Sequence, residues 1–144
     1  MKVLLTGANG YIGKRVLPIL LESNHEVVCA VRDRGRFPLG SMSDDPRISV
    51  VEIDLLGPPS NLEEIRDIDA AYYLVHSMSD DSAEFQILEE RSARNFVKLI
   101  ERTTAKQIIY LGGIVNEDTL SAHLASRKRV GEILASGRVP CTTV

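Results

Sequence analysis

A chain of 144 residues, 44% of them hydrophobic, is long enough for one domain built around one core. The formal net charge of −3 gives no strong field that would favour nucleic acid or an anionic membrane, and no apolar stretch approaches the roughly 20 residues of a membrane span. The apolar run in "MKVLL" is too short for a secretory signal. Cys29 and Cys141 are isolated and lack metal-ligand spacing, as is typical of a reduced, cytoplasmic protein, so we expect no metal site.

The chain alternates between strand-like and helix-like segments. Short apolar runs predict strands at 2–6, 26–31, 48–53, 70–75, 107–112 and from 141 onward. Helical spacing predicts helices at 11–23, 59–68, 83–103 and 121–136, with a loop at 33–47 that holds at most one helical turn. The apolar face of the first helix is expected at Ile12, Val16, Ile19 and Leu20, and Ser60 is expected to cap the second.

Strands separated by helices indicate βαβ units and an α/β fold. Right-handed crossovers then produce a three-layer, doubly wound parallel sheet, the architecture of the Rossmann fold. Ligands of such sheets bind beyond the carboxyl ends of the strands, where the strand order reverses. The strand ends at residues 6, 32, 54, 76 and 112 are therefore the places where a site is expected.

Three glycines stand between the first strand and the first helix, in the spacing Gly7-x-x-Gly10-x-x-Gly13. Glycines at this junction allow a tight turn, a close approach of backbone to a pyrophosphate, and close packing of helix on strand. The phosphates would then lie at a helix N-terminus, where free N–H groups and the helix dipole favour anions. The motif favours nucleotide binding over a structural turn, and we predict that residues 1–144 form one NAD(P)-binding domain.

The stretch "TGANGYIG" resembles the fingerprint of the short-chain dehydrogenase/reductase superfamily in its extended and atypical branches. The segment "AVRDR" is similar to the second strand of NmrA-like members, and "YYLVHSM" to a subgroup of nucleoside-diphosphate-sugar epimerases, within the epimerase/dehydratase type. The resemblance extends through "EIDLLGP", "KQIIYLGG" and "HLASRKRVGEIL". The cofactor-binding residues that the motifs and the resemblance indicate are Gly7, Asn9, Gly10, Tyr11, Ile12, Gly13, Arg32, Asp54, Leu55, Val75, His76 and Ser77.

The residue at the end of the second strand decides which dinucleotide is expected. An acidic residue about 20 positions past the glycines would favour NAD, but the count from Gly13 reaches Arg32. A guanidinium suits a 2′-phosphate, so we favour NADP, with NAD as the alternative if Asp33 binds the ribose instead. Arg34 and Arg36 follow closely and could also contact the 2′-phosphate; the alternative is that they are solvated loop residues. Asp54 is expected near adenine or, alternatively, as a turn cap, and His76 as a wall of the site.

The superfamily's usual catalytic triad is missing from this sequence. The resemblance implies that Ser or Thr orients the substrate oxygen, Tyr transfers its proton, and Lys four residues later holds the nicotinamide ribose. Gly112 and Gly113 stand where Ser or Thr is expected, and the helix aligns as His123-x-x-x-Arg127. His123 and Arg127 share a helix face and are the candidate catalytic residues, or else they merely cover the cofactor. A second alignment pairs Leu124 with Lys128.

Two main functions remain open at this stage. The first, which the resemblance implies, is an oxidoreductase or nucleotide-sugar epimerase/dehydratase type of protein, with a small-molecule substrate that the sequence does not identify. Alternatively, it is a regulatory, redox-sensing or assembly module that binds NADPH without turnover. A glycine-loop fold that has lost its cofactor is a third reading, which Arg32 and Asp54 oppose. Because extended relatives continue past a sixth strand, the resemblance implies a fold truncated before a C-terminal substrate-binding part. The sixth strand would then be an unpaired edge strand, which could pair with a second copy of the chain in a homo-oligomer.

Overall fold

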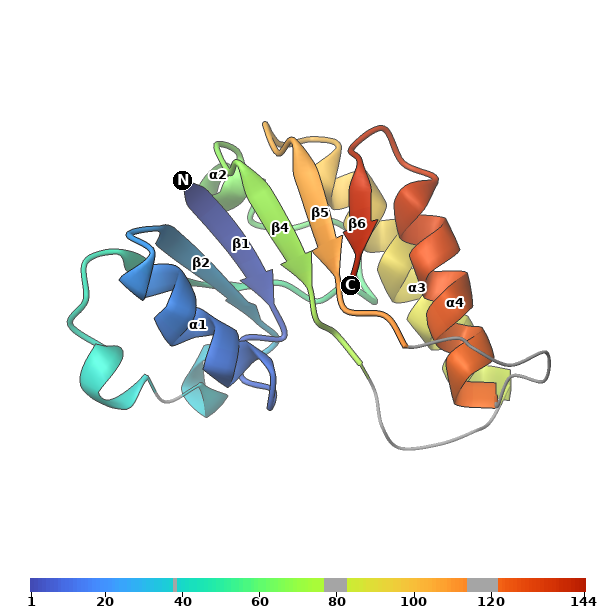
Figure 1. Cartoon of the computed structure of the whole chain (residues 1–144), viewed down its shortest axis with the longest axis horizontal. Helices are drawn as coiled ribbons and strands as arrows, with labels where there is room; N and C mark the ends of the chain where they lie inside the picture. The colour runs from blue at the N-terminus through green and yellow to red at the C-terminus, as the bar shows by residue number, and fades with distance from the viewer. Residues whose placement is uncertain (38, 77–82, 114–121) are drawn as a thin grey trace.

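The computed structural model describes residues 1–37, 39–76, 83–113 and 122–144. Six strands form one sheet in the order β3-β2-β1-β4-β5-β6, and the five neighbouring pairs are all parallel. Helix α1 covers one face of the sheet, and α3 with α4 covers the other (Figure 1). This arrangement confirms the predicted three-layer, doubly wound parallel sheet. The strands are Lys2–Thr6 (β1), Glu26–Val31 (β2), Ile48–Glu52 (β3), Ala70–Tyr73 (β4), Gln107–Tyr110 (β5) and Cys141–Thr143 (β6).

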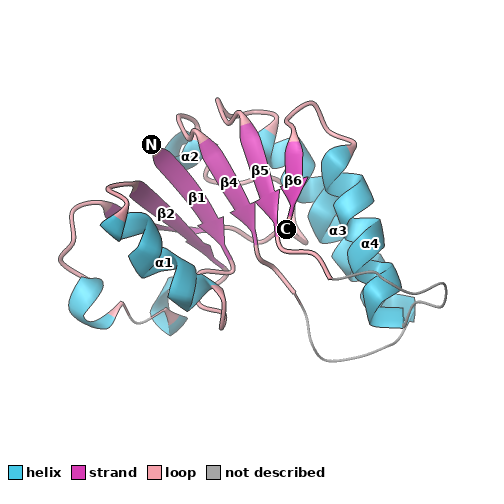
Figure 2. Cartoon of the chain, viewed as in Figure 1, coloured by secondary structure: helices cyan, strands magenta, loops and turns pink. Residues whose placement is uncertain are grey.

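The helices follow the predicted order, with different ends. They are Gly13–Glu22 (α1), Leu62–Ile65 (α2), Ala83–Ile100 (α3) and Ala122–Ala135 (α4), as Figure 2 shows in cyan. The loop at 33–47 holds two short 3-10 turns, at Arg34–Arg36 and Gly40–Met42, where the sequence predicted one turn at most. Pro18 lies inside α1 without ending it.

Both faces of the sheet are buried, as expected for parallel strands between helices. The alternation along β1 is typical, since Val3 and Leu5 face the α1 side and Leu4 faces the side of α3 and α4. The core on the α1 side includes Leu17 and Leu20, and the core on the opposite side includes residues such as Phe96, Leu99, Val130 and Leu134.

The predicted face of α1 is wrong by about one residue. The buried positions of α1 are Gly13, Leu17, Leu20 and Leu21, while Ile12 and Ile19 are 37% and 59% exposed. The rotation of the helix follows from Gly13, where an added Cβ would lie 2.2 Å from the carbonyl oxygen of Gly7. Only the face that carries this glycine can approach the loop so closely.

The predicted cap and length of the second helix are also wrong. Asn61, not Ser60, is the N-cap residue of α2, and it adopts a left-handed conformation with φ of 55°. Its Nδ2 donates a hydrogen bond to the carbonyl oxygen of Glu52 at 2.6 Å, so the side chain ties α2 to the end of β3 instead of capping the helix. The helix is four residues long, which leaves little room for an amphipathic pattern.

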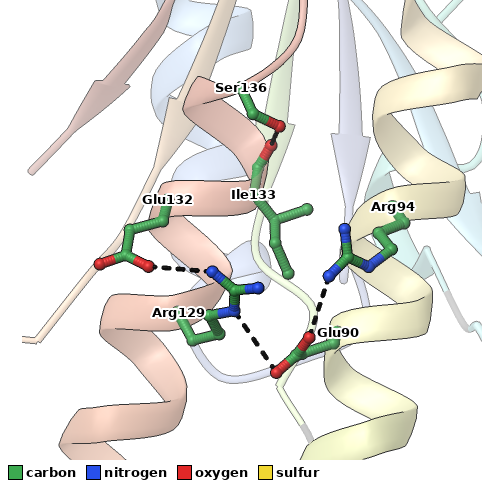
Figure 3. A network of polar contacts seen from close by, with 6 residues as sticks. All are labelled: Glu90, Arg94, Arg129, Glu132, Ile133 and Ser136. Carbon is green, nitrogen blue, oxygen red and sulfur yellow. Dashed lines mark hydrogen bonds and ion pairs between the residues drawn. The ribbon is translucent and has the colours of Figure 1, made fainter.

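Helices α3 and α4 pack side by side and share a polar network on their surface (Figure 3). Glu90 of α3 contacts Arg94 at 3.1 Å and Arg129 of α4 at 3.6 Å, and Arg129 also contacts Glu132 at 3.2 Å. Ion pairs this exposed contribute modestly, at about 0–1 kcal/mol each, so apolar packing supplies most of the contact between the two helices.

Candidate functional site

The strand order reverses between β1 and β4, and a cavity of about 360 Å³ lies beyond the carboxyl ends of these strands. Thr6 holds the two strands together at this point. Its hydroxyl donates a hydrogen bond to the carbonyl oxygen of Tyr72 at 2.8 Å and accepts one from the amide of Leu74 at 3.2 Å. β4 ends at Tyr73, one residue before this bond, and not at the predicted residue 75.

The glycine loop forms one wall of this cavity. Gly7 has a φ of +66°, and an added Cβ there would lie 2.6 Å from the carbonyl oxygen of Leu74. Gly10 donates a backbone hydrogen bond to the carbonyl oxygen of Gly7 at 2.9 Å, and its own Cβ would lie 3.1 Å from that oxygen. The loop is therefore folded so tightly that side chains are excluded at Gly7 and crowded at Gly10, which keeps backbone exposed toward the cavity.

The six residues predicted from the loop divide into two groups. Gly7, Asn9 and Gly10 line the cavity, whereas Tyr11, Ile12 and Gly13 do not. Tyr11 is 71% exposed, and the Arg15 guanidinium lies 3.6 Å above its ring. Ile12 stands at the start of α1 and provides no side-chain cap. The amides of Lys14 and Arg15 already donate to the carbonyl oxygens of Gly10, at 3.1 Å, and of Ile12, at 2.9 Å, so an anion here would rely on the helix dipole and the loop backbone.

On the side of β2 and β3, the cavity is lined by Arg32, Asp54 and Leu55, three of the residues expected to bind the cofactor. Arg32 is exposed and forms no ion pair with a described residue. Asp33, its competitor, is occupied by its own turn. Its Oδ1 accepts a hydrogen bond from the amide of Gly35 at 2.8 Å, and its Oδ2 lies 3.3 Å from Arg36 Nε.

The loop after β3 is held in place by local turns and by α3. Asp54 Oδ1 accepts a hydrogen bond from the amide of Leu56 at 2.9 Å, so Asp54 both lines the cavity and caps a turn. Asn95 of α3 donates from Nδ2 to the carbonyl oxygens of Leu55, at 2.7 Å, and of Gly57, at 3.3 Å. These bonds fix the part of the cavity wall that follows β3.

Val75 and His76 line the cavity at the end of β4, and the predicted Ser77 lies outside the described residues. The His76 ring forms a hydrogen bond with the backbone of Leu111, while its Nε2 is buried without a partner among the described residues. Burial lowers the pKa of His76, and the positive charge of Arg127 lowers it further, against the opposing effects of Glu89 and of the Leu111 bond. His76 is accordingly neutral near pH 7.

The candidate catalytic residues of α4 are not part of the cavity lining. His123 is exposed and Arg127 half-buried, and neither is among the described residues that line the cavity. An added Cβ at Gly113 would lie 2.7 Å from Leu124 Cδ2 and 3.4 Å from Arg127 Cδ, so α4 packs against the point where the resemblance places Ser or Thr. Arg127 acts on the site through its charge on His76.

The tyrosines near the site belong to the core. Tyr73 and Tyr110 are almost fully buried, and Tyr73 packs edge-on against Phe96 with ring centroids 4.8 Å apart. The Tyr110 hydroxyl donates a hydrogen bond to the carbonyl oxygen of Arg127 at 3.1 Å. Burial raises the pKa of Tyr110 to about 12 and that of Tyr73 still further, so neither is suited to exchange a proton near neutral pH.

Helix α3 supplies part of the cavity wall that the sequence did not predict. Phe85, Leu88, Glu89 and Ser92 line the cavity from one helix face. Phe85, Leu88 and Ser92 have the helical spacing that is typical of a buried helix face. The carboxylate of Glu89 also reaches the cavity, and it accepts a hydrogen bond from Ser126.

No helix in the described parts of the chain is long and apolar enough to cross a membrane. No group of three or more His, Cys, Asp or Glu side chains in the same parts is arranged to hold a metal ion.

Comparison with known proteins gives one family and many related folds. A family profile described as NAD(P)H-binding matches residues 7–138. No curated protein matches the chain. Among solved structures, the chain is similar to a nucleoside-diphosphate-sugar epimerase from Staphylococcus aureus, with 18% identity, a TM-score of 0.77, and coverage of 99% of this chain and 49% of that one.

Two further structures are similar at the same level. The triphenylmethane reductase of a Citrobacter species, complexed with NADP(H), shares 19% identity with a TM-score of 0.80 over 99% of this chain and 48% of its own. The UDP-glucuronic acid 4-epimerase of Bacillus cereus, in complex with NAD, shares 20% identity with a TM-score of 0.75 over 99% and 54%. The chain thus spans about half the length of these structures, and identities this low support the fold alone.

Proposed function

Since the chain belongs to the NAD(P)H-binding family, we propose that its cavity binds a dinucleotide and prefers NADPH to NADH. The preference is carried by one observation. Arg32 lines the cavity without an ion pair to a described residue, while both carboxylate oxygens of Asp33 are engaged by Gly35 and Arg36. A free guanidinium suits a 2′-phosphate, whereas an acid already engaged in a turn is a poor partner for a ribose.

The remaining walls fit the other parts of a dinucleotide. In this proposal the pyrophosphate lies against the loop Gly7–Gly13, where close backbone and the start of α1 favour an anion. Asp54 and Leu55, on the β3 side, would form the wall beside the adenine. Val75 and His76, on the β4 side, would form the wall beside the nicotinamide half. When bound, such a cofactor supplies a hydride donor or acceptor. His76 contributes a neutral polar wall beside it.

For the protein's activity, we favour an oxidoreductase or a nucleotide-sugar epimerase/dehydratase type that lacks the usual Ser-Tyr-Lys triad. The support comes from the family and from the names of the similar structures, an epimerase and a reductase among them. The candidate catalytic pair would be His123 and Arg127, which lie on one face of α4.

A non-catalytic, NADPH-binding regulatory module is the second candidate. The observation in its favour is that His123 is exposed and outside the described cavity lining, with α4 packed closely against Gly113. Turnover of NADPH with a panel of carbonyl substrates that is lost in His123→Ala would favour the enzyme. NADPH binding by the wild type with no turnover of any substrate in the panel would favour the regulatory module.

Titration of NADPH and NADH into the wild-type chain and two arginine variants tests the cofactor preference. Arg32→Ala is expected to weaken NADPH about 10- to 100-fold, the loss of charge-assisted hydrogen bonds, and to leave NADH within about twofold. Arg102→Ala removes an equal charge outside the cavity lining and should change neither affinity. Tighter binding of NADH by the wild type would refute the preference.

A further inference from the structure

Glu89 is a carboxylate within the cavity wall that the proposed function does not yet use. It lies on α3 beside Phe85 and Ser92, and it lines the cavity while remaining half-buried. Its Oε2 accepts a hydrogen bond from Ser126 Oγ at 2.5 Å. Ser126 is itself buried in α4, so the bond holds the Glu89 side chain between two helices.

The partner of Glu89 shows to which half of the cavity it belongs. Arg32 and Asp54 follow β2 and β3, which lie on one side of β1 in the sheet. His76 follows β4, on the other side of β1, and Ser126 belongs to the helix after β5. The bond to Ser126 therefore draws Glu89 toward the β4–β5 half, away from the arginine that would take the 2′-phosphate.

Among the residues that the structure describes, no close cation neutralises the charge of Glu89. No described lysine or arginine forms an ion pair with it, although it is near enough to raise the pKa values of Tyr73, His76 and Tyr110. Arg127 opposes that effect on His76 and Tyr110. An ionised carboxylate accepts several hydrogen bonds, and Ser126 satisfies one of them, so acceptor capacity remains for a ligand hydroxyl.

We propose that Glu89 binds the hydroxyls of the ribose in the nicotinamide half of the dinucleotide. This proposal rests on the proposed function above. Carboxylates hold a ribose in this fold on the adenosine side, through hydrogen bonds to its hydroxyls, and the same chemistry serves a ribose on the other side. Glu89 would then supply contacts to the ribose that the resemblance assigns to Lys, at a position where this chain has Arg127.

Two ligands and three variants test this assignment. NADPH contains both halves of the dinucleotide, whereas adenosine 2′,5′-bisphosphate contains only the half expected at Arg32. Glu89→Gln keeps the shape and removes the charge, so it should weaken NADPH about tenfold and leave the bisphosphate within about twofold. Glu90→Gln is the matched control, because Glu90 belongs to the surface network with Arg94 and Arg129 (Figure 3) and does not line the cavity.

Ser126→Ala provides a second route if Glu89→Gln fails to fold, as circular dichroism would show. It leaves the carboxylate but removes its holder, so a loss of a few-fold for NADPH alone is expected. Unchanged NADPH affinity in the folded variants, or an equal loss for both ligands, would overturn the assignment of Glu89 while leaving the proposed function intact. Failure of the wild type to bind either ligand would overturn the proposed function itself, and the assignment with it.

Discussion

Replacing Gly13 by Ala adds one methyl group at the point where α1 meets the glycine loop. The new Cβ would lie 2.2 Å from the carbonyl oxygen of Gly7 and 2.7 Å from Ala8 Cα, closer than real contacts allow. Since both neighbours are backbone, the helix or the loop must move by about 1 Å. Overpacking of this kind costs about 1–3 kcal/mol, at the upper end here, and the higher helix propensity of Ala recovers at most about 1 kcal/mol.

We expect Gly13→Ala to lose about 2 kcal/mol of unfolding free energy, or about 6 °C in Tm for a chain of this size. NADPH affinity should fall as well, because the same movement shifts Gly7 and Gly10 in the cavity wall. Urea unfolding and a nucleotide titration measure the two effects. Gly57→Ala is the control, since its Cβ would lie 3.6 Å from the Asp54 carbonyl oxygen, an ordinary contact. Equal stability of the two variants would refute the account of the loop.

Three further predictions concern other parts of the site and core. Because the folded protein has a lowered His76 pKa, the unfolded chain takes up a proton more readily, and the unfolding free energy should fall as pH drops below about 6.5. His76→Gln should reduce that fall between pH 7.5 and 5.5 in urea unfolding, and an unchanged fall would contradict the lowered pKa. Asn95→Leu removes the bonds to Leu55 and Gly57 and should cost about 1–3 kcal/mol in urea unfolding, whereas a neutral result would show that the loop after β3 holds itself. Burial raises the pKa of Cys29 to about 12, so its labelling by iodoacetamide at pH 8 should require unfolding, and fast labelling of the native protein would contradict the burial.

The fold could be predicted from sequence because its signals are local and agree with one another. Apolar runs, helical spacing and the glycines after β1 all indicate one doubly wound sheet, and the structure confirms it. The errors lie where a distant contact overrides a local pattern. The face of α1 is set by the contact of Gly13 with Gly7, and the N-terminus of α2 by the bond of Asn61 to Glu52.

The cavity was predicted in part for a similar reason. Residues at strand ends, such as Arg32, Asp54 and His76, are placed by the topology, so the sequence could indicate them. Glu89 could not be found in this way, because its position depends on how far α3 extends beyond the sheet and on a bond to Ser126, 37 residues later. The engagement of Asp33 by Gly35 and Arg36 likewise depends on a 3-10 turn that the loop composition only suggested.

A crystal structure of the chain soaked with NADPH would test the central claim most directly. The account predicts the pyrophosphate against the loop Gly7–Gly13, the 2′-phosphate within hydrogen-bond distance of the Arg32 guanidinium, and Asp33 still bound to the amide of Gly35. A nucleotide whose ribose is held by Asp33, with Arg32 turned away, would contradict the preference for NADPH. Nucleotide density outside the cavity between the ends of β1 and β4 would contradict the site itself.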